Sequence, residues 1–191
     1  MHPMDTFVEQ IVEKRKGAKE WAIIGGLVLA LLVVVILLLW FLGLFSLIFI
    51  AGAGYGAWWL ITSQNVEFEY SVTNGDIDID QITAKRKRKR IVSVSGEKIE
   101  SMQLYRPEEF ANRPFDRTVV AAPSTMEESL WCFSYHSKKN GHTLVIFQPE
   151  ERVFNALKGG LPKLVQMDID RKMRQQSRNQ SAESTEEHHE E

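Results

Sequence analysis

An uninterrupted apolar stretch from Trp21 to Ile61 constrains this chain more than any other feature of its sequence. No Asp, Glu, Lys, Arg or His occurs between Glu20 and Glu67. A stretch this long and this apolar is typical of a segment that lies in lipid rather than in the core of a soluble protein. Its length and the glutamates upstream of it argue against a cleaved signal peptide.

The stretch is too long for one membrane crossing. A single helix would be roughly 62 Å long at about 1.5 Å per residue, whereas the hydrocarbon core is about 30 Å thick. We therefore predict a transmembrane helical hairpin over residues 21–62, with helices at about 21–41 and 44–62 and a turn near Gly43. Because no ionisable residue lies within the spans, an ion or proton pathway is not expected.

Aromatic and small residues fit this hairpin. Tryptophans stand where the helices would meet the membrane interfaces, and they are the expected interface anchors: Trp21, Trp40, Trp58 and Trp59. Small residues recur every four positions in each helix, at Ala22, Gly26 and Ala30 and at Gly52 and Gly56. Since such spacing lets helix backbones approach closely, we expect these residues to pack the two helices together. Homodimerisation through the same faces is the alternative.

Charge predicts the orientation of the hairpin, although the formal net charge is only -2. Four basic residues precede the first helix: Lys14, Arg15, Lys16 and Lys19. The predicted turn has none, so both termini are expected in the cytoplasm of a multi-pass protein of the cell membrane. The single cysteine, Cys132, excludes an intrachain disulfide.

Residues 1–20 form an amphipathic N-terminal segment. Thr6 and Glu9 have the spacing of a capping box, and the apolar residues between Phe7 and Val12 would share one face of a helix. Two interpretations are open. The segment is either a helix on the membrane surface or a cytosolic flank that docks on the later domain.

Residues 65–172 have the pattern of a small β domain. Apolar and polar residues alternate from Val66 to Thr73, the pair Asn74-Gly75 is a strong hairpin signal, and Ile77 and Ile79 continue the alternation. Further short strands are expected near 91–94, 98–105, 118–122, 130–136 and 142–147. Helical spacing follows from residue 150, with an interruption at 159–162. Residues 173–191 are polar and are expected to be a disordered tail.

The predicted fold class is therefore α+β: a transmembrane helical hairpin followed by an antiparallel β barrel or sandwich capped by a C-terminal helix. The stretch from Tyr70 to Ile79, with Ile91-Val-Ser-Val and Lys98-Ile-Glu-Ser-Met, resembles the opening strands of bacterial PH-like domains. The whole arrangement also resembles a family of small, uncharacterised bacterial membrane proteins with a two-helix anchor. This resemblance covers most of residues 1–170 and implies a cytoplasmic PH-like domain without catalytic residues.

The most conspicuous polar feature is a run of six basic residues: Lys85, Arg86, Lys87, Arg88, Lys89 and Arg90. A packed core cannot take every second one of them, so we expect a loop or a strand end. An out-and-back pair of strands would return the run to the point where the chain leaves the membrane. The run is either a membrane-surface site for anionic lipids or a solvated basic loop. Nucleic acid is unlikely, because no aromatic stacking platform accompanies the run.

No sequence pattern indicates an enzyme. Cys132 lies between Trp131 and Phe133 in a predicted strand, where a small buried thiol is usual. His188 and His189 lie on the polar tail and do not make a defined metal site. No phosphate-binding glycine loop or nucleophile elbow occurs. We therefore predict no metal, no cofactor and no catalytic residue.

The expected function is that of a non-enzymatic, membrane-anchored binding or scaffold module. Its expected partners are the lipid bilayer, anionic lipids, and other membrane proteins or a second copy of the chain. The alternative is an accessory subunit of a larger membrane complex, in which the hairpin itself makes the contacts.

Overall fold

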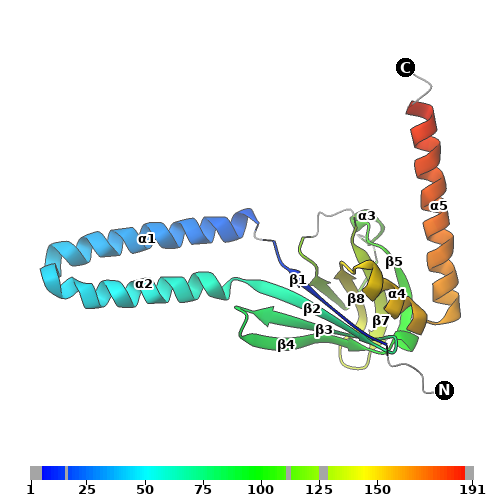
Figure 1. The fold of residues 1–191 in the computed structure, drawn as a ribbon, viewed down its shortest axis with the longest axis horizontal. Helices are drawn as coiled ribbons and strands as arrows, with labels where there is room; N and C mark the ends of the chain where they lie inside the picture. Colours follow the sequence, from blue (N-terminus) through cyan, green and yellow to red (C-terminus); the bar gives the residue numbers. More distant parts are fainter. Residues whose placement is uncertain (1–5, 16, 111–112, 125–128, 188–191) are drawn as a thin grey trace.

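The computed structural model describes residues 6–15, 17–110, 113–124 and 129–187. A helical hairpin extends from one end of two packed β-sheets, and a long helix stands at the other end (Figure 1). The elements are, in order, β1 (Phe7–Glu13), α1 (Ala18–Leu42), the 3-10 turn η1 (Gly43–Phe45), α2 (Ser46–Ser63), β2 (Val66–Thr73), β3 (Asp76–Thr83), β4 (Lys87–Val94), the 3-10 turn η2 (Gly96–Lys98), β5 (Ile99–Leu104), α3 (Pro107–Phe110), β6 (Arg117–Ala121), β7 (Trp131–Ser137), β8 (Gly141–Phe147), α4 (Glu151–Gly160) and α5 (Lys163–Glu187).

The hairpin of α1 and α2 is inserted between two adjacent strands of one sheet. β1 pairs antiparallel with β2, and Glu13 lies opposite Glu67. One step further, the backbone N–H of Lys14 donates to the carbonyl of Val66 at 2.9 Å. Both helices therefore leave the sheet from the same end, side by side (Figure 1).

The strand β1 corrects the helical interpretation of the N-terminal segment. Val8 and Val12 pack against the core of the sheets, whereas Phe7 and Ile11 lie exposed on the opposite face. Apolar residues at positions 7, 8, 11 and 12 have helical spacing, and in a strand they divide between its two faces. The segment forms a strand because it pairs with β2. It therefore docks on the later domain and contributes to its first sheet.

The chain reverses direction at η1. Gly43 has a φ of +54°, which a glycine adopts without steric cost. The Ser46 hydroxyl donates to the Gly43 carbonyl at 2.6 Å and satisfies a backbone group of the turn. By length and composition, α1 from Glu20 to Leu42 and α2 from Ser46 to Ser63 are each apolar and long enough to cross a membrane.

The first sheet has the strand order β1-β2-β3-β4. Thr73 lies opposite Asp76, so Asn74 and Gly75 form a two-residue turn. Both have positive φ, 52° and 87°, as this kind of hairpin turn requires. A bulge interrupts the pairing of β3 with β4 between Ile79 and Asp80.

The second sheet has the order β5-β7-β8-β6 and contains one parallel pair, which the predicted antiparallel barrel or sandwich did not include. β7 and β8 form a hairpin, but β6 runs parallel to β8. β8 lies between β6 and β7 in the sheet, although β6 and β7 are consecutive in the chain. β7 runs opposite to β6, and β8 reverses again, so β8 has the same direction as β6. Within the described residues the two sheets do not close into a barrel, and the domain is a sandwich.

The core lies between the sheets and beneath α4. The rings of Tyr70 and Phe133 both pack edge-on against Phe147, at centroid distances of 5.8 and 5.3 Å. Val153 and Leu157 of α4 are fully buried. The C-terminal cap is thus one short helix, with α5 following after the interruption at Pro162.

The helix α5 is longer than the sequence analysis expected. Ile169 is buried against the sheets, and the helix continues to Glu187 through residues assigned to a disordered tail. Its sequence contains neither Gly nor Pro, and Gln, Arg, Lys and Glu are good helix formers.

Candidate membrane-surface site

The six basic residues of the run lie in the β3–β4 turn and in the first half of β4. Lys85 and Arg86 belong to the turn, and Lys87 to Arg90 begin the strand. All six are exposed. The side chains on both faces of the first half of β4 are exposed, so the run needs no place in the core.

The turn that carries the run lies at the root of the hairpin. Val66, the first residue of β2 after α2, is opposite Thr83, and the N–H of Ala84 donates to the carbonyl of Asn65 at 2.8 Å. The guanidinium carbon of Arg86 stands 5.6 Å from the centre of the Trp58 ring on α2. The expected return of the run to the end of the second helix is confirmed by these contacts.

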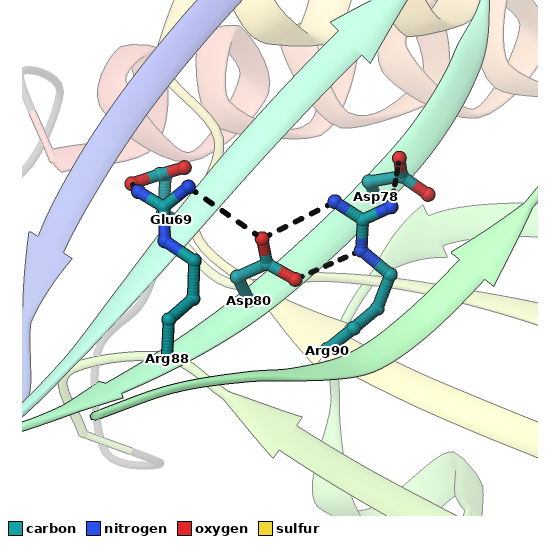
Figure 2. A network of polar contacts seen from close by, with 5 residues as sticks. All are labelled: Glu69, Asp78, Asp80, Arg88 and Arg90. Atoms are coloured by element: carbon teal, nitrogen blue, oxygen red, sulfur yellow. Dashed lines mark hydrogen bonds and ion pairs between the residues drawn. The ribbon is translucent and has the colours of Figure 1, made fainter.

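Two members of the run are engaged in ion pairs on the outer face of the first sheet (Figure 2). Arg90 binds the Asp80 carboxylate with two nitrogens, at 2.9 and 3.2 Å, and contacts Asp78 at 2.9 Å. Arg88 donates to Glu69 and lies 3.9 Å from Asp80. Two-nitrogen contacts of this kind hold the guanidinium in a defined orientation.

The partners of these arginines are buried carboxylates. Glu69 and Asp80 are only 3% and 5% exposed. Burial raises the pKa of Glu69, and the nearby charges of Glu9 and Asp80 act in the same direction, whereas Arg88 opposes them. Arg88 and Arg90 therefore neutralise acidic groups of the sheet and are not available to an external anion.

The other four residues of the run form what we name the basic edge. It consists of Lys85, Arg86, Lys87 and Lys89. Lys85, whose side chain is 71% exposed, makes an ion pair at 3.6 Å with the largely buried carboxylate of Glu67. Within the described part of the chain, Arg86, Lys87 and Lys89 have no carboxylate partner. Lys14, next to the start of α1, lies at the same end of the sheet.

The acidic partners of Arg88 and Arg90 were missed by the analysis of the sequence. A signal for them exists, because Glu67 and Glu69 alternate with core residues in one strand and Asp78 and Asp80 do so in the next. Opposite charges on neighbouring strands attract, so a following basic strand is expected to pair with these acids. The sequence analysis considered the run as a surface for external partners or as a solvated loop, and it did not consider pairing with these acids.

The predicted interface anchors lie at the two ends of the hairpin. Trp21 on α1 and Trp58 and Trp59 on α2 lie near its root, and Trp40 is at the turn. All four are at least half exposed, and Trp40 is 81% exposed. Side chains of this type at both ends of an apolar helix pair are typical of membrane interfaces.

The small residues do not form one packed contact between α1 and α2. Ala22 and Gly26 are exposed, and a Cβ added at Gly26 or Gly52 would meet no atom within 4 Å. A shallow groove of about 290 Å³ between the helices includes Ala30 and Gly56. Larger α1 side chains line the same groove, and the sequence analysis did not consider them: Leu27, Leu31 and Val34.

The remaining candidate residues are Cys132 and the histidines. Cys132 is buried in β7, and burial raises the pKa of its thiol to about 12. His142 stacks near Phe115 and lies 3.4 Å from Glu100. Among the described residues no three or more His, Cys, Asp or Glu side chains gather as metal ligands. The pair His188 and His189 lies outside the described residues.

A comparison with known families agrees with the architecture of two packed sheets followed by a C-terminal helix. A family model described as a bacterial PH-like domain (DUF6106) matches residues 4–167, which include the hairpin as well as the sheets. No curated protein and no solved structure matches the chain. PH-like domains are in general non-catalytic binding modules. Because the match extends over most of the chain, the protein belongs to this family of bacterial PH-like domains.

Proposed function

We propose that this chain is a membrane-anchored binding module whose basic edge holds the PH-like domain against anionic lipid. The observation that carries the proposal is the contact of Arg86 with Trp58, which places the β3–β4 turn beside the last turns of α2. If α2 spans the membrane, the basic edge lies at the lipid headgroups. Each basic residue near an anionic leaflet contributes about 1 kcal/mol.

The exposure of the hairpin supports the membrane anchor. The apolar side chains of α1 are largely uncovered, including Leu29 at 66% and Ile36 at 61%. An apolar surface of this extent is unfavourable in water, and a helix in the core of a soluble protein would be covered. We infer that both helices cross the bilayer and that both termini are cytoplasmic. A periplasmic phosphatase fused at the C-terminus should be inactive, and an active fusion would contradict this topology.

The register of β1 and β2 provides a soluble chain for the lipid experiment. Lys14 and Val66 lie opposite each other, so residues 15–65 can be replaced by Asn-Gly as a two-residue turn. This hairpin-replaced chain keeps every residue of both sheets and of the basic edge, and we expect it to fold. It should float with vesicles of phosphatidylcholine and phosphatidylserine but not with phosphatidylcholine alone. Added salt should weaken the binding, because the attraction is electrostatic and screened.

Two variants with the same change in charge test the basic edge. The first combines Lys85→Gln, Arg86→Gln, Lys87→Gln and Lys89→Gln, and it should lose flotation. The control removes four exposed charges elsewhere on the domain: Lys98→Gln, Arg152→Gln, Arg171→Gln and Arg174→Gln. Equal flotation of the parent and the edge variant, or an equal loss in the control, would contradict the proposal.

The uncovered small residues favour a second candidate, an accessory subunit that contacts another membrane protein through α1. Gly26 and Ala22 lie on an exposed face, where a second apolar helix can approach closely. The full chain with Gly26→Leu should then lose membrane proteins that co-purify in mild detergent, whereas Val33→Leu should retain them. Retention in both variants would contradict this candidate.

A further inference from the structure

A cleft of about 400 Å³ lies between α5 and the edge strand β5, with the α3 segment closing one side. β5 and α5 stand at the end of the sandwich remote from the hairpin (Figure 1). The volume is within the range of sites for small molecules. The cleft is separate from the basic edge, and no residue of the hairpin lines it.

Three basic side chains face this cleft, against one carboxylate. Arg106 and Arg113 come from the segment around α3, and Lys172 comes from α5. The carboxylate of Glu109 accepts a hydrogen bond from the side-chain amide of Gln103 at 3.0 Å, which orients the carboxylate and leaves its charge in place. The same Gln103 accepts from Lys172 at 2.6 Å, so this pair of contacts connects β5 to α5.

Among the residues that line the cleft, Arg106 and Arg113 are best suited to bind an external anion. Lys172 contacts Asp168 at 2.9 Å and is therefore partly neutralised. Among the described residues no carboxylate pairs with Arg106 or Arg113, and both are exposed. The Arg113 guanidinium is held 5.7 Å from the centre of the Phe110 ring. An oriented guanidinium binds phosphate or carboxylate with two parallel hydrogen bonds.

The floor and the opposite wall of the cleft are apolar. Met102 and Ile169 are each 1% exposed and form the floor, and Trp131 and Met173 stand beside them. The Trp131 ring packs on Phe154 at a centroid distance of 4.5 Å, which fixes this wall. A bare inorganic anion would leave these apolar walls unused.

We propose that the cleft binds a small soluble anion in which a phosphate or a carboxylate is joined to a compact apolar group. The anionic group lies between Arg106 and Arg113, and the apolar group lies against Trp131 and Met173. The site takes its ligand from the solvent rather than from the bilayer, because it faces away from the root of the hairpin. It does not depend on the lipid contact of the basic edge.

The test is a calorimetric titration of the full chain in micelles of a non-ionic detergent. Phenyl phosphate and benzoate are the probes for the two anionic groups, and inorganic phosphate lacks the apolar part. At least one of the two aromatic probes should saturate the cleft at concentrations of about 1 mM or below, and inorganic phosphate should bind at least about tenfold more weakly. The aromatic probe that saturates the cleft shows whether the site prefers a phosphate or a carboxylate.

Matched variants locate the site. The double variant Arg106→Gln and Arg113→Gln should weaken binding of the aromatic probe by about tenfold or more, since a hydrogen bond to a charged group contributes about that factor. Arg152→Gln, an exposed arginine on α4, should bind like the parent. Met173→Gln should weaken the binding of the aromatic probe and leave the binding of inorganic phosphate unchanged.

Three outcomes would overturn the proposal. They are the absence of saturable binding by both aromatic probes, unchanged binding in the double arginine variant, and inorganic phosphate binding as tightly as the aromatic probes. Because the substituted arginines are exposed, the variants should keep the parent's far-ultraviolet circular dichroism. Arg106→Gln alone serves as a second variant if the double one fails to fold.

Discussion

The side-chain oxygen of Gln10 accepts a hydrogen bond from the backbone N–H of Glu150 at 2.7 Å. Its amide nitrogen donates to the carbonyl of Gln148 at 3.1 Å. These two bonds join the strand before the hairpin to the residues that begin α4, although some 140 positions separate them in the chain. The PH-like domain is therefore built from both sides of the hairpin.

We predict that the hairpin-replaced chain folds, whereas a chain starting at residue 65 is strongly destabilised. Without β1, the edge of β2 and part of the core around Val8 and Val12 are exposed. Burying an aliphatic side chain contributes about 1.5–3 kcal/mol, so the loss is a large part of the stability of a small domain. Urea unfolding followed by circular dichroism measures the difference. Equal midpoints for both chains would show that β1 is dispensable.

A second prediction concerns the contact of Gly160 with Gly75. The backbone of Gly160 at the end of α4 lies directly against the β2–β3 turn, and a Cβ at residue 160 would overlap atoms of Gly75. Gly160→Ala should therefore destabilise the hairpin-replaced chain by about 1–3 kcal/mol, the usual range for overpacking.

The neighbouring residue provides the control. A Cβ at Gly159 would meet no atom within 4 Å, and α4 is helical there. Gly159→Ala should be neutral or stabilise by up to about 1 kcal/mol, because alanine favours the helix. A similar loss in both variants would contradict the close approach of α4 to the turn.

A third prediction follows from the raised pKa of Glu69. Between the ordinary value of 4.5 and the raised pKa, the native chain binds more protons than the unfolded chain. The contribution of Glu69 to stability is therefore favourable at acidic pH and is lost as the pH rises through this window. Replacing Glu69 by Gln removes this dependence.

The measurement is the free energy of unfolding of the hairpin-replaced chain between about pH 4 and about pH 8. Relative to Glu69→Gln, the parent should lose stability as the pH rises and then level off above the raised pKa. Glu97→Gln, which removes an exposed acid on η2, is the charge-matched control. If the free energy of unfolding of the parent instead increased with pH relative to that of Glu69→Gln, the charge of Arg88 would outweigh burial in setting the pKa of Glu69.

The fourth prediction is that the Cys132 thiol is unreactive in the folded chain. With a pKa of about 12 and a buried position, it is protonated at neutral pH and inaccessible. A disulfide reagent such as dithionitrobenzoate at about pH 8 should react only after unfolding, since an unperturbed thiol titrates near this pH. Rapid reaction of the native chain would contradict the buried position of the Cys132 side chain in β7.

The sequence by itself determined the local structure of this protein. The apolar stretch and Gly43 predicted a helical hairpin, and Asn74-Gly75 between alternating residues predicted the turn of β2 and β3. Each of these features depends on residues that are neighbours in the chain, where periodicity and backbone preferences decide the conformation.

Only the tertiary structure decided which distant segments meet. The strand β1 forms because β2 offers a paired edge, and Arg88 and Arg90 turn away from external anions because Glu69 and Asp80 lie buried beside them. The cleft between β5 and α5 exists only once the last helix returns to the second sheet. These contacts join residues far apart in the chain, and their energies depend on burial and on charges that a local pattern does not contain.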